Sequence, residues 1–356
     1  MKLKANRLVL GVGKWVPPIR RPGTLKLDLN ENVIDFPIDY STLLANGAIS
    51  TYPEYDILLE RLSKYIGLPT GCITLTNGAD QAIDITIKSL FEAGDRVIIP
   101  SPTFSYYYHV LKLNSVAYDP VLYTNAGNGF EFPYYEVMAK LSEADGVILT
   151  NPSNPLGISI PDIQLEGIIN KCEQYNIPCI IDEAYFEYSD SSVCERLKNC
   201  ECLIIIRTFS KYFGLAGVRI GYVISDPIIG DIFQSVRGPW DVNSLAVLMG
   251  TWCIDNAEFF KTRHLKFIHN KNTIERSLRS SGIFVSQTKA NFILARDNTK
   301  PIPIKFAENN VMVSDLAEYP ESRGLLVNHT RIGIPANEND VSNLISIIQS
   351  MSPVIA

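Results

Sequence analysis

Three short and almost uninterrupted apolar runs constrain the fold of this chain more than any other feature. They lie at residues 146–150, 178–182 and 203–207. Such runs are typical of strands that are covered on both faces, as in a mostly parallel α/β sheet. Residues 163–175, between the first two runs, have a helical pattern long enough for a crossover connection. The sequence therefore predicts an α/β fold with a mostly parallel central sheet.

The pattern of apolar residues also predicts how the chain is divided. Further expected elements are a helix over 78–91, a strand over 96–100, long helices over 244–253 and 258–280, and strands at 290–295 and 331–334. We predict a large domain at 41–241 and a smaller α+β domain at 242–356. Residues 1–40 are expected to form an N-terminal arm and part of the small domain.

Composition limits the class of protein. The chain has 356 residues, of which 46% are hydrophobic and 20% charged, as in globular proteins. A net charge of −6 disfavours binding to nucleic acid or to an anionic membrane. The apolar runs are too short to span a bilayer, and no apolar segment that would make a signal peptide follows the basic start. Seven cysteines without a Cys-x-x-Cys pair indicate reduced thiols in the cytoplasm, and we expect no metal site.

Polar residues follow each of the three apolar runs. The sequences are NPSNPLG at 151–157, DEAY at 182–185 and TFSK at 208–211. Taken singly, each is ordinary, because a lysine is usually a solvated surface charge and a strand-end aspartate is often a turn residue. Ligands bind at the carboxyl ends of the strands in open α/β sheets, so these residues are expected to converge on one pocket.

These residue types match the chemistry of a pyridoxal 5′-phosphate (PLP) site. A lysine must form an imine with the aldehyde of the cofactor, and a carboxylate must hold the pyridine nitrogen protonated. Neutral donors must hold the ring oxygen, and a helix N-terminus suits the phosphate. The sequence predicts PLP as the cofactor.

With these motifs in place, the chain resembles the fold-type I PLP enzymes and, among them, the histidinol-phosphate aminotransferase subgroup. The resemblance spans residues 27–348. The motifs that carry it are LNEN at 29–32, NGAD at 77–80, NPSNPLG at 151–157, DEAY at 182–185, RTFSK at 207–211, GLAGVRIGY at 214–222 and RIGI at 331–334.

The resemblance implies three catalytic residues. Lys211 looks like the lysine that forms the Schiff base and then moves the α-proton of the substrate. Asp182 is expected to pair with the pyridinium nitrogen. Tyr185, together with Asn154, is expected to hold the ring oxygen of the cofactor.

The resemblance also implies further cofactor contacts. Phe104 is similar to the aromatic residue that stacks on the ring, although many relatives have tyrosine there. The expected phosphate cradle consists of Gly78, Ala79, Asp80, Thr208, Ser210 and Arg219. Tyr52 matches the residue that reaches the phosphate of the neighbouring subunit, which implies a homodimer with shared active sites.

The chain differs from the subgroup at the residues that are expected to contact the substrate. Arg331 matches the arginine that binds a substrate carboxylate or phosphate, and Asn32 is a second expected substrate contact. Relatives have a second arginine where this chain has Ser314. The loss of one charged contact to a phosphate costs on the order of 1.5–3 kcal/mol of binding. Arg323 is the nearby residue that could compensate.

The resemblance leaves more than one function open. The leading hypothesis is an aminotransferase of amino acid biosynthesis that transfers an amino group between a small, possibly phosphorylated, amino donor and a 2-oxo acid acceptor. The stretch GPWDVNSLA at 238–246 is similar to threonine-phosphate decarboxylases, so a decarboxylase of O-phospho-L-threonine or O-phospho-L-serine is the alternative. A non-catalytic PLP-fold module is a third hypothesis, but Lys211, Asp182 and Tyr185 are all present.

Overall fold

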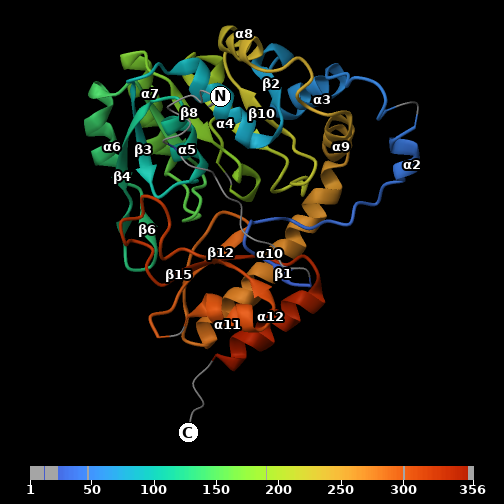
Figure 1. The fold of residues 1–356 in the computed structure, drawn as a ribbon, viewed down its shortest axis with the longest axis vertical. Coiled ribbons are helices and arrows are strands. Elements are labelled where there is room, and N and C mark those ends of the chain that lie inside the picture. Colours follow the sequence, from blue (N-terminus) through green and yellow to red (C-terminus); the bar gives the residue numbers. More distant parts are fainter. Residues whose placement is uncertain (1–11, 13–22, 46–47, 190, 300, 352–356) are drawn as a thin grey trace, which may run out of the picture.

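A computed structural model describes residue 12 and residues 23–351, apart from 46–47, 190 and 300. Most of the expected N-terminal arm, residues 1–11 and 13–22, lies outside the described residues. The described chain has two parts, a large α/β part at the top of Figure 1 and a smaller part below it. No helix of the described residues is long and apolar enough to cross a bilayer.

A seven-stranded sheet forms the centre of the large part. Its order is β2 (Ile73–Thr76), β10 (Gly221–Ile224), β9 (Leu203–Thr208), β8 (Cys179–Asp182), β7 (Gly146–Thr150), β3 (Arg96–Ser101) and β4 (Ala117–Leu122). Strands β9, β8, β7, β3 and β4 are parallel, and β10 is antiparallel to both of its neighbours. The predicted mostly parallel sheet is confirmed, and the three apolar runs are its adjacent strands β7, β8 and β9.

Both faces of the central strands β7, β8 and β9 are buried, which explains why these three strands are almost uninterruptedly apolar. Successive residues point to opposite faces, so Ile180 and Ile204 join one core cluster while Ile181 and Ile205 join another. The first face is covered by α4 (Gly78–Leu90), α5 (Tyr106–Leu113) and α8 (Pro227–Val236). The second is covered by α3 (Asp56–Ile66), α6 (Tyr134–Lys140), α7 (Asp162–Tyr175) and α9 (Ser244–Asp255).

The smaller part is built on an antiparallel sheet. Its order is β11 (Phe284–Ser286), β12 (Phe292–Arg296), β15 (His329–Gly333) and β14 (Ser314–Asp315). A separate parallel pair joins β1 (Leu25–Lys26) to β13 (Val311–Met312). Helices α10 (Ala257–Ser280), α11 (Ile302–Glu308) and α12 (Glu338–Ser350) pack around a core that includes Leu27 and Ile274.

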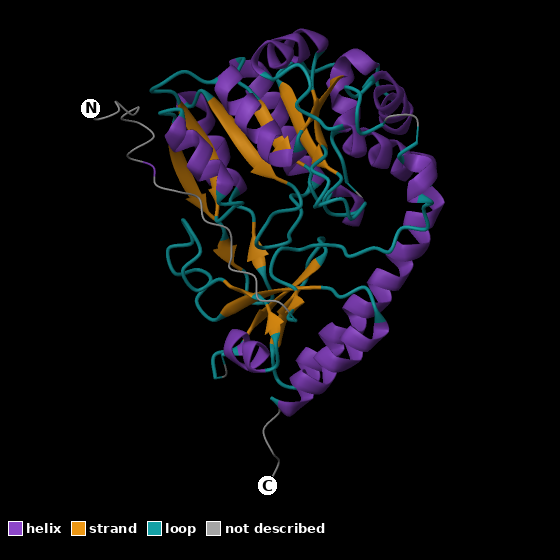
Figure 2. Cartoon of the chain, turned by 45° about the vertical axis from the view of Figure 1, so that its right-hand side comes forward, coloured by secondary structure: helices purple, strands orange, loops and turns teal. Residues whose placement is uncertain are grey.

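The long helix α10 connects the two parts, running down one side of the molecule in Figure 2. Helix α9 still packs against α3, beside the large sheet. The chain therefore passes from the large sheet to the small sheet along α10. The domain boundary expected near residue 242 stays a prediction.

The remaining elements are short. They are α2 (Tyr40–Leu43), β5 (Thr124–Asn125), β6 (Phe130–Glu131) and 3₁₀ turns at Thr70–Cys72, Leu141–Glu143, Phe186–Tyr188 and Cys194–Lys198. The sequence patterns did not predict strands β2, β4 and β10. Polar residues such as Thr74 and Thr76 interrupt β2, and Pro120 lies in β4, where it is tolerated because β4 is an edge strand.

Candidate active site

A cavity of about 630 Å³ lies at the carboxyl ends of β7, β8 and β9, and residues of both parts of the molecule line it. Most of the predicted site residues are brought together there. The predicted residues that line the cavity are Ala79, Asp80, Phe104, Asn154, Asp182, Tyr185, Thr208, Ser210, Lys211, Arg219 and Arg331. The strand-end residues converge as expected, because parallel strands end at the same edge of the sheet.

Lys211 lies three residues beyond the end of β9. Burial lowers the pKa of its amine to about 8, and the positive charge of Arg331 acts in the same direction. Its Nζ atom donates a hydrogen bond to the backbone oxygen of Leu29 at 3.0 Å. An amine with this pKa is partly neutral near pH 7, and the neutral form is the nucleophile.

Asp182 is the last residue of β8. It is buried, and it lines the cavity together with Lys211. Its Oδ1 accepts a hydrogen bond from the amide of Ala184, and its Oδ2 accepts one from the hydroxyl of Tyr107, both at 2.9 Å. Burial raises the pKa of Asp182 to about 6, so its charge would be stabilised by a cation placed against it. The protonated ring nitrogen of PLP is such a cation.

Tyr185 is held by a segment distant in sequence. The Nδ2 of Asn30 donates to the hydroxyl of Tyr185 at 3.0 Å. Asn30 has a positive φ of 54°, and its backbone oxygen accepts from Asn291 at 2.8 Å. Burial raises the pKa of Tyr185, so the hydroxyl stays protonated and can donate.

The other end of the cavity is suited to a phosphate. Arg219 lies at this end, and its Nη2 atom donates a hydrogen bond to Asp80 Oδ2 at 2.8 Å. Asp80 is in the first turn of α4. Thr208 donates to Ser210 at 3.0 Å. Gly78 does not line the cavity, but its φ is +77° and a Cβ there would lie 2.5 Å from Arg219 Nη2. A glycine at this position therefore lets the guanidinium approach the helix N-terminus.

Arg331 lines the cavity from β15 of the smaller part. Its Nη1 donates to Asn154 Oδ1 at 2.6 Å, and its Nη2 donates to the backbone oxygen of Asp28 at 2.6 Å and to Ser314 at 3.0 Å. Its buried Nε has no hydrogen-bond acceptor among the described residues. Arg331 is thus positioned mainly by neutral groups.

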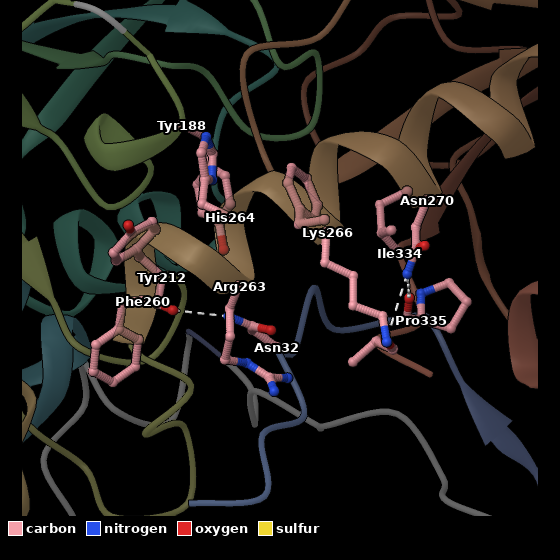
Figure 3. Close-up of a pocket in the computed structure, with 12 residues that line it drawn as sticks. Asn32, Tyr188, Tyr212, Phe260, Arg263, His264, Lys266, Asn270, Ile334 and Pro335 are labelled. Atoms are coloured by element: carbon pink, nitrogen blue, oxygen red, sulfur yellow. Dashed lines mark hydrogen bonds between the residues drawn. The ribbon is translucent and has the colours of Figure 1, made fainter. Parts of the chain in front are cut away.

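Two predicted residues lie elsewhere. Asn32 lines a second, smaller pocket against α10 and donates to the backbone oxygen of Tyr212 at 2.8 Å (Figure 3). Tyr52 is 71% exposed and stacks on Trp240, with 4.2 Å between ring centres. Their proposed contacts with the substrate and with a second subunit stay predictions. Arg323 is exposed and is not among the lining residues of the large cavity.

Several residues of the site were not predicted. Tyr107 and Asn30 orient Asp182 and Tyr185, and Asp28 and Tyr319 line the cavity. Asn30 lies in the LNEN motif, which was the available signal for its role. Tyr107 lies inside a helix among other tyrosines, so the sequence carries no signal that separates it from core residues.

The side chains that line the cavity match the groups that PLP requires, in the roles expected for them. Asp182 is a buried carboxylate for the ring nitrogen, Lys211 supplies a reactive amine, and Tyr185 and Asn154 supply polar groups for the ring oxygen. Arg219 and the N-terminus of α4 suit the phosphate. Fold and site together define a fold-type I PLP-dependent enzyme.

Comparison with known proteins gives the family. Residues 24–348 match the model of aminotransferase class I and II. A histidinol-phosphate aminotransferase of Ruminiclostridium cellulolyticum is 28% identical over 90% of this chain and 91% of its own, and a putative threonine-phosphate decarboxylase of Caldanaerobacter subterraneus is 31% identical over 76% of each. The crystal structure of the Clostridium acetobutylicum histidinol-phosphate aminotransferase has a TM-score of 0.81 at 25% identity, covering 92% of this chain and 98% of that one.

The chain belongs to the class I and II aminotransferase family. It is a PLP-dependent aminotransferase, related to histidinol-phosphate aminotransferases and to threonine-phosphate decarboxylases. The expected fold, cofactor and family are confirmed.

Proposed function

We propose that this aminotransferase acts on small amino acids and 2-oxo acids, and that Arg331 binds their carboxylate. The proposal rests on the burial of Arg331 and on the partners of its guanidinium. It is buried, its Nε has no acceptor, and among the described residues no carboxylate forms an ion pair with it. A buried cation without a counter-ion is costly, so an anionic substrate group would complete the site.

A phosphorylated substrate is less well supported. Ser314 occupies the place of a second arginine, and its hydroxyl donates to the backbone oxygen of Asp28 at 2.7 Å. Lys211, Arg219 and Arg331 are the lysine and arginine residues among the described lining of the cavity. Arg219 lies at the cofactor-phosphate end, which leaves Arg331 as the cation for the substrate. We therefore propose that an amino acid is preferred to histidinol phosphate.

The residues around Lys211 support proton transfer at the substrate Cα. PLP, when bound, supplies the sink for the electrons released at this carbon. The Nζ of Lys211 would take the proton from Cα and return it, because its lowered pKa leaves the amine partly neutral. Asp182 would hold the ring nitrogen protonated, and Arg331 would orient the substrate.

A homodimer with shared sites is part of the proposal. Tyr52 and Trp240 are exposed and stack on each other outside the cavity of their own chain. An exposed aromatic pair of this kind suits contact with a second copy. All seven cysteines are free, which supports a location in the cytoplasm, where thiols stay reduced.

A decarboxylase remains the second candidate. The similarity to the Caldanaerobacter subterraneus protein and the segment around Trp240 favour it. Decarboxylation and transamination differ in which bond at Cα is broken, and that choice depends on how Arg331 orients the carboxylate.

The first experiment tests the cofactor site. The purified protein is expected to show the visible absorption band of lysine-bound PLP, and Lys211→Ala is expected to lose it. Lys271→Ala is the matched control, because burial also lowers the pKa of Lys271 to about 8 but its amine binds the backbone oxygens of Thr288 and Ala290. If Lys271→Ala loses the band and Lys211→Ala keeps it, the assignment of Lys211 as the PLP-binding lysine is contradicted.

The second experiment tests the reaction and the substrate. L-glutamate is expected to convert the bound PLP to its pyridoxamine form, and a panel of amino donors should rank amino acids above L-histidinol phosphate. Release of CO₂ from O-phospho-L-threonine without a 2-oxo acid would instead identify a decarboxylase. A stronger response to histidinol phosphate than to any amino acid would overturn the proposed preference.

A further inference from the structure

The loop at residues 237–243, between α8 and α9, contacts both sides of the phosphate end of the cavity. An ion pair fixes the loop at its start. Arg237 donates from Nη2 to Asp241 Oδ1 and from Nε to Asp241 Oδ2, the latter at 3.2 Å. Only 5% of the Arg237 side chain and 11% of the Asp241 side chain are exposed. Two charge-assisted hydrogen bonds therefore hold the Asp241 carboxylate in one direction.

The Asp241 carboxylate holds the first turn of α4 through Gln81. The Nε2 of Gln81 donates to Asp241 Oδ2 at 2.7 Å, and its Oε1 accepts from the backbone amide of Asn77 at 2.6 Å. Asn77 precedes Gly78, which begins the helix with a φ of +77°. Gln81 thus fixes the turn whose backbone amides are the proposed donors to the phosphate.

The same loop holds the segment that carries Arg219. The Nδ2 of Asn243 donates to the backbone oxygen of Val218 at 3.1 Å. Arg219 follows with a φ of 62°, which residues with a side chain rarely adopt. A backbone of this kind persists only where its surroundings hold it. Since Arg219 also binds Asp80, the loop supports both halves of the proposed phosphate site.

We propose that Gln81, together with Asp241, is a positioning residue for the phosphate of PLP. Neither is among the described residues that line the cavity, so both act through the backbone of residues 77–80. The inference rests on the proposed phosphate end of the cavity. Loss of the contact is expected to weaken binding of the phosphate and to leave the ring, which Lys211 and Asp182 are proposed to hold, unaffected.

The first test compares PLP with pyridoxal, which has the same ring and aldehyde but no phosphate. Both are titrated into the cofactor-free, full-length protein, and the visible imine band reports binding. Gln81→Met removes both hydrogen bonds and adds no charge. It is expected to raise the dissociation constant of PLP roughly tenfold and to leave that of pyridoxal within about twofold. Gln174→Met, on the exposed face of α7, is the matched control and is expected to change neither constant.

The second test exchanges the donor and the acceptor of the contact. Gln81→Glu keeps an acceptor for the amide of Asn77 but places a carboxylate against Asp241, so PLP binding is expected to weaken roughly tenfold or more. Adding Asp241→Asn to Gln81→Glu restores a donor opposite an acceptor. This double variant is expected to bind PLP within about threefold of the wild type, because substitutions of residues in contact are not additive.

Arg219→Gln separates this inference from the phosphate site on which it rests. It is expected to weaken binding of PLP but not of pyridoxal, and an unchanged Arg219→Gln would overturn the phosphate site together with the role of Gln81. If Arg219→Gln weakens PLP selectively and Gln81→Met does not, only the role of Gln81 is overturned.

Two further outcomes would overturn the proposal. An equal loss of PLP and pyridoxal in Gln81→Met would mean that Gln81 supports the fold alone. A double variant as weak as Gln81→Glu would mean that the contact with Asp241 does not position the phosphate. None of these measurements depends on which substrate the aminotransferase uses.

Discussion

At the scale of the residue, the carboxylate of Asp182 is costly to the protein when no cofactor is bound. Burial raises its pKa from 3.8 to about 6. The folded state therefore binds more protons than the unfolded state between these pH values. The stability that the protonated carboxyl contributes is present below about pH 4 and is lost as the pH rises through 6.

We predict that Asp182→Asn stabilises the cofactor-free protein at pH 7 by roughly 1–3 kcal/mol, because it removes a buried charge. The gain is expected to shrink as the pH is lowered toward 4, and turnover is expected to fall roughly 100-fold or more because the ring nitrogen loses its anion. Urea unfolding at both pH values and steady-state kinetics test this prediction.

The matched control for this variant is Asp231→Asn, since Asp231 is exposed on α8. It should change neither unfolding nor turnover. An equal gain in stability at pH 7 and pH 4, or full activity in Asp182→Asn, would show that the buried charge of Asp182 does not have the assigned role.

At the scale of the element, the contact between β10 and the start of α4 holds the phosphate end of the site. Gly221 begins β10, and a Cβ there would lie 2.8 Å from the backbone carbon of Gly78 and 2.9 Å from the amide nitrogen of Ala79. Backbone atoms cannot move aside as a flexible side chain can. The spacing of the helix and the strand thus requires glycine at position 221.

Gly221→Ala is predicted to push α4 away from β10, costing about 1–3 kcal/mol of stability and weakening PLP binding. Gly217→Ala is the control, because no atom lies within 4 Å of a Cβ at Gly217. Urea midpoints and equilibrium dialysis of PLP measure both effects. Equal behaviour of the two variants would contradict the close contact.

At the scale of the whole molecule, the cofactor site is expected to depend on a second copy of the chain. Tyr52→Phe is predicted to weaken PLP retention roughly tenfold or more, because a hydrogen bond to a charged phosphate contributes about 1.5–3 kcal/mol. Unfolding should be unchanged, since Tyr52 is exposed in the single chain. Dialysis of PLP and sedimentation velocity measure retention and oligomeric state.

Tyr135→Phe is the matched control, because Tyr135 is also exposed, on α6. It is expected to retain PLP like the wild type. A monomer that retains PLP, or a Tyr52→Phe dimer with unchanged retention, would count against shared sites.

The sequence by itself determined the four neighbouring strands β3, β7, β8 and β9 of the large sheet, the strand-end residues and the family. These features depend on local patterns, because an apolar run fully buried on both faces and the polar residue that ends it lie next to each other in the chain. Residues 146–150 form β7 as predicted, and Asp182 and Lys211 lie on the cavity.

Only the tertiary structure decided how these side chains are held. Asn30 binds Tyr185 across 155 positions, and Arg331 binds the backbone of Asp28 across 303. Such contacts depend on side-chain direction and on the packing of distant segments, which no local pattern of residues encodes.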